Sequence, residues 1–376
     1  WRPGCCSTRP GIDAGVARCG GQRGNRVESP SLNPVPSALR YAAILSILGI
    51  LTFPRFFLMA TRNPSSEFRI LSLSGGGYLG LYTAVVLADL EARVGEPLAR
   101  RFDLIAGTSV GGLLAMALAF EVPMAHIVKL FVERGDEVFS SRRLPGSTVT
   151  RLIDLTRSVL GPKYTGEALR RELTHHFGDR TLGDALHAVV VPAVDVSRSV
   201  TKVFKTPHAQ ASLGDEALSA VDVTLATCAA PAFFPCVKVG DRLYADGGLF
   251  AVAPDQVALH EAELFMGTKP SRVRMLSVGT ATMGYQPADS VEADSGAVGW
   301  LTDGRLILTM ISVQQQHVQA IMEDRLQDRY LRLDAPWPSQ AGLGIDIATR
   351  TAAETLSALG RDTLLQTDPE RIRAFL

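Results

Sequence analysis

Three glycine-containing turns carry the side chains of this sequence that could perform chemistry. The first is Gly107-Thr108-Ser109-Val110-Gly111, a Gly-x-Ser-x-Gly pattern. Where this pattern joins a strand to a helix, the turn pushes the serine hydroxyl out of the path of the chain, and the helix start brings a positive dipole end near the reacting oxygen. Side chains at Gly107 and Gly111 would collide with the turn and the neighbouring strand. With a strand before it and a helix after it, the pattern predicts Ser109 as a nucleophile. Without these flanking elements, the alternative is an ordinary glycine turn with a solvated serine.

The second turn offers backbone donors rather than side chains. It reads Gly75-Gly76-Gly77-Tyr78-Leu79-Gly80. Three successive glycines leave backbone N–H groups uncovered, and such a concavity binds a developing negative charge. The run also satisfies the Gly-x-Gly-x-x-Gly string of dinucleotide-binding folds, so a nucleotide loop stays open from this run alone. A Walker loop is excluded because Gly-Lys-Ser/Thr is absent.

The third turn, Asp246-Gly247-Gly248, places a carboxylate beside two glycines. An acid in this setting can approach another loop without steric hindrance. An aspartate that caps its own turn is the commoner interpretation of a lone Asp-Gly-Gly. Together the three turns could supply a nucleophile, an oxyanion site and a base.

Alternating strands and helices must position these turns. We expect strands at 69–74, 102–106, 188–194, 200–205, 242–245, 272–278 and 330–333. We expect helices at 81–94, 110–120, 124–138, 165–177, 221–230, 255–265, about 301–325 and about 348–359. This alternation predicts an α/β protein with a mostly parallel sheet covered on both faces. Right-handed crossovers then bring the first two turns to the edge where the strands end.

Four segments in a fixed order resemble the patatin-like phospholipase family. They are Ile70–Gly80, Ala106–Gly112, Ala226–Pro235 and Asp246–Gly248, and the resemblance covers about residues 69–280. It implies a three-layer α/β/α sandwich and a Ser–Asp dyad that hydrolyses acyl esters of membrane lipids. By this resemblance Ser109 is the nucleophile and Asp246 the base. The oxyanion hole is formed by Gly75, Gly76 and Gly77, and the motif glycines are Gly80, Gly107, Gly111, Gly247 and Gly248.

Two other functions remain open. An α/β-hydrolase esterase would need a histidine after the aspartate, and His260 and His317 follow Asp246. Both fall in expected helices, whereas a triad histidine usually lies on a loop. A catalytically silent binding or signalling module is the second alternative, against which the intact serine, aspartate and glycines argue.

No cofactor or metal site is predicted. Adjacent histidines such as His175 and His176 point about 100° apart on a helix and cannot share a metal ion. The chain carries 38 Lys and Arg against 38 Asp and Glu, and this balance argues against general nucleic-acid binding. With 46% hydrophobic residues the chain can bury a large core.

The N-terminal residues differ from the rest of the chain. Residues 1–58 hold seven Arg, no Lys, one Asp and one Glu, and their apolar run at 41–53 is shorter than the roughly 20 residues of a membrane span. We expect 1–58 to be a disordered leader, either non-native upstream sequence before Met59 or a targeting segment. Residues 69–280 form the expected catalytic domain, and residues 281–376 are expected to be a mainly helical extension packed on it.

The resemblance also implies partners and a location. The substrate would be a membrane phospholipid or another acyl lipid, reached from the cytoplasm through peripheral contact with the membrane. Some compact bacterial members of the family resemble antiphage effectors that cyclic nucleotides switch on. A cyclic-nucleotide activator is therefore a hypothesis for this chain, with residues 285–376 as the candidate control surface.

Overall fold

The computed structural model describes residues 67–139, 161–209, 214–286, 300, 304–338 and 342–376. The chain divides into two units, Trp1–Phe57 and Leu58–Leu376, and all described residues belong to the second. The expectations for residues 1–58 thus lie outside the described residues. Among the described helices, none combines the length and the apolar character that crossing a membrane requires.

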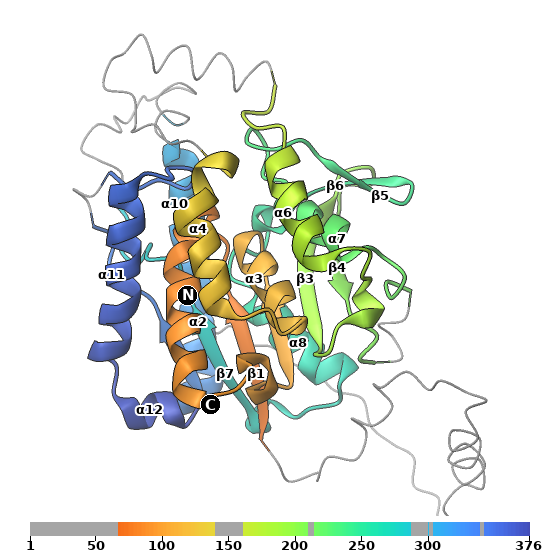
Figure 1. Ribbon diagram of the computed structural model, residues 1–376. Helices are drawn as coiled ribbons and strands as arrows, with labels where there is room; N and C mark the ends of the chain where they lie inside the picture. Colours follow the sequence, from red (N-terminus) through yellow and green to blue (C-terminus); the bar gives the residue numbers. More distant parts are fainter. Residues whose placement is uncertain (1–66, 140–160, 210–213, 287–299, 301–303, 339–341) are drawn as a thin grey trace, which may run out of the picture. The chain divides into compact units, whose positions relative to one another are not determined.

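An eight-stranded sheet forms the centre of the second unit (Figure 1). Its strands are β1 (Phe68–Leu73), β2 (Leu104–Gly107), β3 (Val189–Asp195), β4 (Val200–Lys205), β5 (Val237–Val239), β6 (Arg242–Asp246), β7 (Val273–Val278) and β8 (Tyr330–Leu333). The order is β5-β6-β3-β2-β1-β7-β8, and β4 pairs with β3. The pairs among β3, β2, β1, β7 and β8 are parallel, whereas β4, β5 and β6 pair antiparallel. The prediction of a mostly parallel sheet is confirmed.

Helices cover both faces of this sheet. Successive residues of a strand point to opposite sides, so one strand can contribute to the core on each face. Ile70 packs in one buried cluster, and Leu71 packs in the other. The cluster around Leu71 includes residues of α2 (Gly80–Val94), α3 (Val110–Ala119), α4 (Met124–Val138), α6 (Glu167–Phe177), α7 (Ala220–Thr227), α11 (Arg350–Gln366) and α12 (Pro369–Arg373). The cluster around Ile70 includes residues of α8 (Asp255–His260) and of the C-terminal half of α10 (Arg305–Leu326). The layers form the expected α/β/α sandwich.

One edge of β3 is shared by two strands that point toward each other. β2 pairs in parallel with the first residues of β3, with Ala106 opposite Val190. β6 pairs antiparallel with the last residues of β3, with Asp246 opposite Ala193. Because β4 occupies the other edge of β3 from Val190 to Asp195, which overlaps the pairings of both β2 and β6, β2 and β6 must lie end to end. The turns that follow β2 and β6 are thereby brought together.

Several elements differ from the sequence-based expectations. β5 and α12 were not expected, and the helix expected at 255–265 changes from α-helix to π-helix at Glu261. The helix expected to end at about residue 359 runs to Gln366 as α11. Within it, Gly360 lets α11 approach α2 closely, since a Cβ there would lie 3.0 Å from the Val85 side chain. The start of the helix expected at about 301 lies outside the described residues.

Candidate active site

Ser109 lies in the tight turn between β2 and α3, as the motif predicts. Its backbone adopts φ 55° and ψ −127°, a conformation rare for a residue with a side chain. The turn is possible because Gly107 and Gly111 are in close contact: a Cβ on Gly107 would lie 2.1 Å from the Gly111 carbonyl oxygen. A Cβ on Gly111 would lie 2.2 Å from the carbonyl oxygen of Leu73 in β1. The collisions expected at both glycines are thus present.

A buried threonine holds this turn from behind. The Ser109 backbone N–H donates to Thr227 Oγ1 at 3.0 Å, and the Thr227 hydroxyl donates to the carbonyl oxygen of Pro192 in β3 at 2.6 Å. Thr227 is fully buried at the end of α7. The strained conformation of Ser109 is therefore fixed to the central sheet through one side chain that the sequence did not single out.

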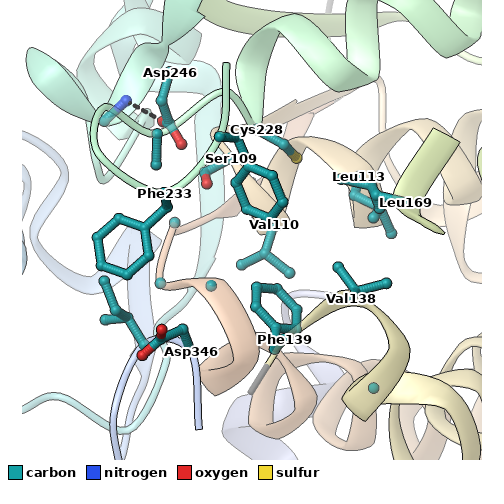
Figure 2. A pocket seen from close by; sticks show the side chains of 18 of the residues that line it. Ser109, Val110, Leu113, Val138, Phe139, Leu169, Cys228, Phe233, Asp246 and Asp346 are labelled. Carbon is teal, nitrogen blue, oxygen red and sulfur yellow. Dashed lines mark hydrogen bonds between the residues drawn. The ribbon is translucent and has the colours of Figure 1, made fainter. Parts of the chain in front are cut away.

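Asp246 ends β6 and points toward Ser109 (Figure 2). The Gly248 backbone N–H donates to Asp246 Oδ1 at 2.7 Å, and the carboxylate also interacts with the Ser109 hydroxyl. Gly247 packs against β3, where a Cβ would lie 2.3 Å from the Pro192 carbonyl oxygen. The Asp-Gly-Gly turn thus both caps itself and presents its carboxylate to the serine.

Burial raises the pKa of Asp246 to about 6, although the hydrogen bonds from Ser109 and Gly248 act in the opposite direction. Asp246 is only 5% exposed, and burial penalises its ionised form. At neutral pH such a carboxylate is ionised, and it is a stronger base than an ordinary aspartate. This combination suits a general base.

The glycine loop after β1 lies against Ser109. A Cβ on Gly75 would lie 3.2 Å from the Ser109 Cβ. The Gly75 N–H donates to the Val252 carbonyl oxygen at 2.8 Å, so it is already engaged. Within the described part of the chain, the N–H groups of Gly76 and Gly77 have no hydrogen-bond partner. Gly77 has φ +59°, and a Cβ there would lie 2.1 Å from the Ile345 carbonyl oxygen, so only glycine fits.

A cavity of about 400 Å³ opens at these residues. Ser109, Asp246 and Gly75–Gly77 line it, and the rest of its wall is mostly apolar. The apolar wall includes Val110, Leu113, Val138, Phe139, Leu169, Phe233, Ile307 and Met310. Figure 2 shows Ser109 and Asp246 on one side of this space and Leu113, Leu169, Val138 and Phe139 on the other. Gly80 lies behind the glycine loop, in contact with the Val110 side chain.

The histidines of the alternative triad do not line this cavity. His260 lies on α8 and His317 on α10, and both side chains are exposed. His176 lines the cavity from α6, and its pKa is lowered mainly by burial. The rings of His126 and His175 meet its ring edge-on. In the described residues, no cluster of three or more His, Cys, Asp or Glu side chains could hold a metal ion.

Sequence motifs missed the residues that hold the loops in place. Thr227 lies within the resembling segment Ala226–Pro235, but nothing in its spacing indicated a bond to Ser109. Gln314 and Gln315 of α10 contact the Asp246 turn and the glycine loop, more than sixty residues from either in the chain. In the sequence, the signal for these two residues was a pair of polar side chains among apolar positions of an expected helix.

Comparisons with known proteins identify the family to which the chain is similar. The family model described as patatin-like phospholipase matches residues 71–259. A cGAMP-activated phospholipase of Pseudomonas aeruginosa is 39% identical over 78% of this chain and 86% of that protein. A cGAMP-activated phospholipase of Vibrio cholerae is 32% identical over 79% and 90%. A cUMP-AMP-activated phospholipase of Escherichia coli is 32% identical over 56% and 64%.

Proposed function

The chain belongs to the patatin-like phospholipase family, and we propose on this basis that it is a lipid acyl hydrolase whose dyad is Ser109 and Asp246. The observation that carries the proposal is the position of the Asp246 carboxylate beside the Ser109 hydroxyl at an apolar cavity. The raised pKa of Asp246 supports its assignment as base. No third group is needed when one carboxylate both accepts and returns the proton.

In the proposed reaction, Ser109 Oγ bonds to the ester carbonyl carbon while its proton moves to Asp246. The carbonyl oxygen becomes an oxyanion, and the N–H groups of Gly76 and Gly77 are the donors proposed to stabilise it. The carbon–oxygen bond to the alcohol then breaks, and the alcohol leaves with the proton from Asp246. Water attacks the acyl-serine, again giving its proton to Asp246. The fatty acid departs, and Ser109 recovers its proton.

The cavity supports an acyl chain as the group that lies beside the serine. Its wall is formed by α3, α4, α6 and the N-terminal half of α10, and apolar side chains predominate in it. An apolar chain gains about 0.8 kcal/mol for each buried methylene, whereas a charged head group would lose its hydration there. We therefore assign the cavity to the acyl chain and leave the head group toward the opening.

Exposed apolar side chains around the opening support peripheral contact with a membrane. Leu249 and Leu306 both line the cavity and are 45% and 37% exposed. Phe250 follows Leu249 and is 36% exposed. In a lipid surface these side chains would be buried, and the ester of a membrane lipid would meet Ser109 without leaving the bilayer completely.

We also propose activation by a cyclic oligonucleotide. The support is the naming of the relatives from Pseudomonas aeruginosa and Vibrio cholerae as cGAMP-activated and of the Escherichia coli relative as cUMP-AMP-activated. The two names point to different nucleotides, so the identity of the activator is part of the test. The extension after β7, which contains α10, β8, α11 and α12, is the candidate control surface.

The experiment measures fatty acid released from mixed phospholipid vesicles by the full chain and by its Ser109→Ala and Asp246→Asn variants. Each protein is assayed alone and with a panel of cyclic di- and trinucleotides that includes cGAMP and cUMP-AMP. Release by the native chain, lost in both variants, is the expected result. Stimulation by one nucleotide supports the activator.

Equal release with and without every nucleotide would contradict the activator but leave the hydrolase intact. If no condition gives release, labelling of Ser109 by a fluorophosphonate probe decides the question. Failure to label Ser109 under any condition would contradict the hydrolase and favour the silent binding module.

A further inference from the structure

Three consecutive glutamines on α10 have different surroundings. Gln315 is buried, Gln314 is half-buried, and Gln316 is exposed, with its side-chain amide donating to the Ser312 hydroxyl at 2.8 Å. Buried glutamines are costly unless both ends of the amide find partners. The side-chain partners of Gln314 belong to the loop after Asp246, and one contact of Gln315 is with the glycine loop, while its other partners lie on β8 and after β7.

Gln314 bridges the loop that follows Asp246. Its Nε2 donates to the Gly248 carbonyl oxygen at 3.2 Å, and its Oε1 accepts from the Val252 backbone N–H at 3.2 Å. Gly248 is also the residue whose N–H bonds the Asp246 carboxylate. One amide group therefore holds both ends of this loop and the peptide that contacts the base.

Gln315 faces the glycine loop. Its Nε2 lies 3.3 Å from Thr280 Oγ1 and 3.5 Å from the Gly75 carbonyl oxygen, and Thr280 Oγ1 lies 3.5 Å from the same oxygen. Its Oε1 accepts from Arg332 Nη2 at 2.5 Å. Arg332 is itself anchored by an ion pair with Asp334 at 2.9 Å. The glutamine is thus oriented by a charged group that is fixed to β8.

The two loops also bond to each other between these glutamines. The Val252 N–H binds Gln314, while the Val252 carbonyl oxygen accepts from the Gly75 N–H at 2.8 Å. Gly75 therefore bonds to the base loop through its N–H and faces Gln315 through its carbonyl oxygen. The series Gln314–Val252–Gly75–Gln315 forms a continuous connection from α10 through both loops and back to α10.

We propose that Gln314 and Gln315 are positioning residues that hold the Asp246 loop and the Gly75–Gly77 loop in register, so that base and oxyanion donors meet the same ester. Neither glutamine touches the reacting atoms. The proposal rests on the proposed function, because it assigns the two loops their roles. The same helix also lines the cavity, about one turn or more before the two glutamines, through Ile307, Met310 and Ile311. α10 thus connects the wall of the acyl cavity to the register of the loops.

The test compares Gln314→Met and Gln315→Met with the matched control Gln316→Met, which makes the same change on the exposed side of the helix. Turnover of a short soluble ester and its pH dependence are measured, together with thermal unfolding. We expect kcat to fall about 10- to 100-fold in the first two variants, with KM changed less than about twofold. In Gln314→Met the pH at half-maximal kcat/KM should rise, because the Gly248 N–H that lowers the pKa of Asp246 loses its support.

Two further variants keep the test decisive if a methionine variant does not fold. Gln315→Glu keeps the acceptor for Arg332 and loses the donor toward Gly75, and Gln314→Glu keeps the acceptor for Val252 and loses the donor to Gly248. Each is expected to retain the fold and lose part of kcat.

Wild-type kcat and pH dependence in folded Gln314 and Gln315 variants would overturn the positioning role while the hydrolase stands. If the native chain turns over no ester with or without the cyclic nucleotides, labelling of Ser109 by a fluorophosphonate decides the proposed function separately. The rate of Ser109 labelling by a fluorophosphonate, which needs both loops but no turnover, then decides the role of the glutamines. Unchanged labelling rates in these variants would overturn it.

Discussion

The Asp246 carboxylate reaches the Ser109 hydroxyl because β6 and β2 run toward each other along one edge of β3. A purely parallel sheet would place both residues at the ends of neighbouring strands, one strand spacing apart. Here the antiparallel β6 lies in line with β2 and ends close to it. The approach of base and nucleophile is therefore a property of the sheet, and not only of two flexible loops.

The first prediction concerns the pH dependence of hydrolysis. Because the pKa of Asp246 is raised to about 6, the base is protonated and inactive below this pH and ionised above it. We expect kcat/KM for a soluble ester to fall about tenfold for each pH unit below 6 and to level off above 7. A pH–rate profile from pH 4 to 8 measures this. A rising limb centred near pH 4 would show that Asp246 titrates as an ordinary carboxyl.

The second prediction is that the same carboxylate costs stability. Folded Asp246 keeps its proton up to about pH 6, whereas in the unfolded chain the carboxyl ionises near its ordinary pKa of 3.8. The cost is therefore absent below about pH 4 and complete above about pH 6, with an upper size of about 3 kcal/mol. Asp246→Asn should abolish turnover and raise the unfolding temperature at pH 7.5 but not at pH 4. Equal unfolding temperatures at pH 7.5 would contradict the buried charge.

The third prediction concerns Thr227, which connects Ser109 to β3. Thr227→Val has nearly the same shape but leaves the Ser109 N–H and the Pro192 carbonyl without this partner. We expect a loss of about 1–3 kcal/mol in the free energy of unfolding. The strained turn should also relax, with a fall in kcat of about tenfold or more.

Thr227→Ser is the matched control, because it keeps the hydroxyl and removes one methyl group. Urea unfolding and kcat on a soluble ester are measured for both variants. If Thr227→Val and Thr227→Ser have the same kcat, the hydroxyl does not position Ser109.

The sequence was sufficient for the elements whose signals are local. The strand before Ser109 and the helix after it follow from one apolar run on each side of a glycine turn, and α4 was expected at its observed bounds. The short strand β5 was missed because its three residues lie between Pro235 and Gly240, too few for a visible alternation. The expected end of α11 was about seven residues too early, and the last turns of this helix include Gly360, which contacts α2 in the folded structure.

Less of the site could be predicted from the sequence, for the same physical reason. A motif identifies a residue whose local turn needs particular neighbours, as at Ser109 and Gly77. The residues that support the site from a distance, such as Thr227, Gln314 and Arg332, need only a partner of the right kind in space. Nothing adjacent in the chain is required of them, so only the folded arrangement reveals their roles.

The fourth prediction tests the acyl cavity. Leu113 on α3 lines it, so Leu113→Trp should fill part of the space that a long acyl chain would occupy. Each methylene excluded costs about 0.8 kcal/mol, which is roughly a fourfold loss in kcat/KM. We expect long-chain esters to lose tenfold or more while butyrate esters change little. Leu365→Trp is the control, because Leu365 of α11 is 77% exposed. An equal loss for short and long chains would show that the acyl chain lies elsewhere.

The last prediction concerns the opening of the cavity, where Leu249 and Leu306 would contact a lipid surface. Replacing both by Asn removes apolar area that a membrane would bury, about 1.5 kcal/mol or more for each leucine. Binding to phosphatidylcholine–phosphatidylglycerol vesicles should weaken at least tenfold, and vesicle hydrolysis should fall with it. Turnover of a soluble ester should change much less, because the dyad is untouched. Leu243→Asn is the control, since Leu243 is 44% exposed on β6 and does not line the cavity. If the Leu243 variant loses vesicle binding as strongly as the double variant, the membrane contacts a different face.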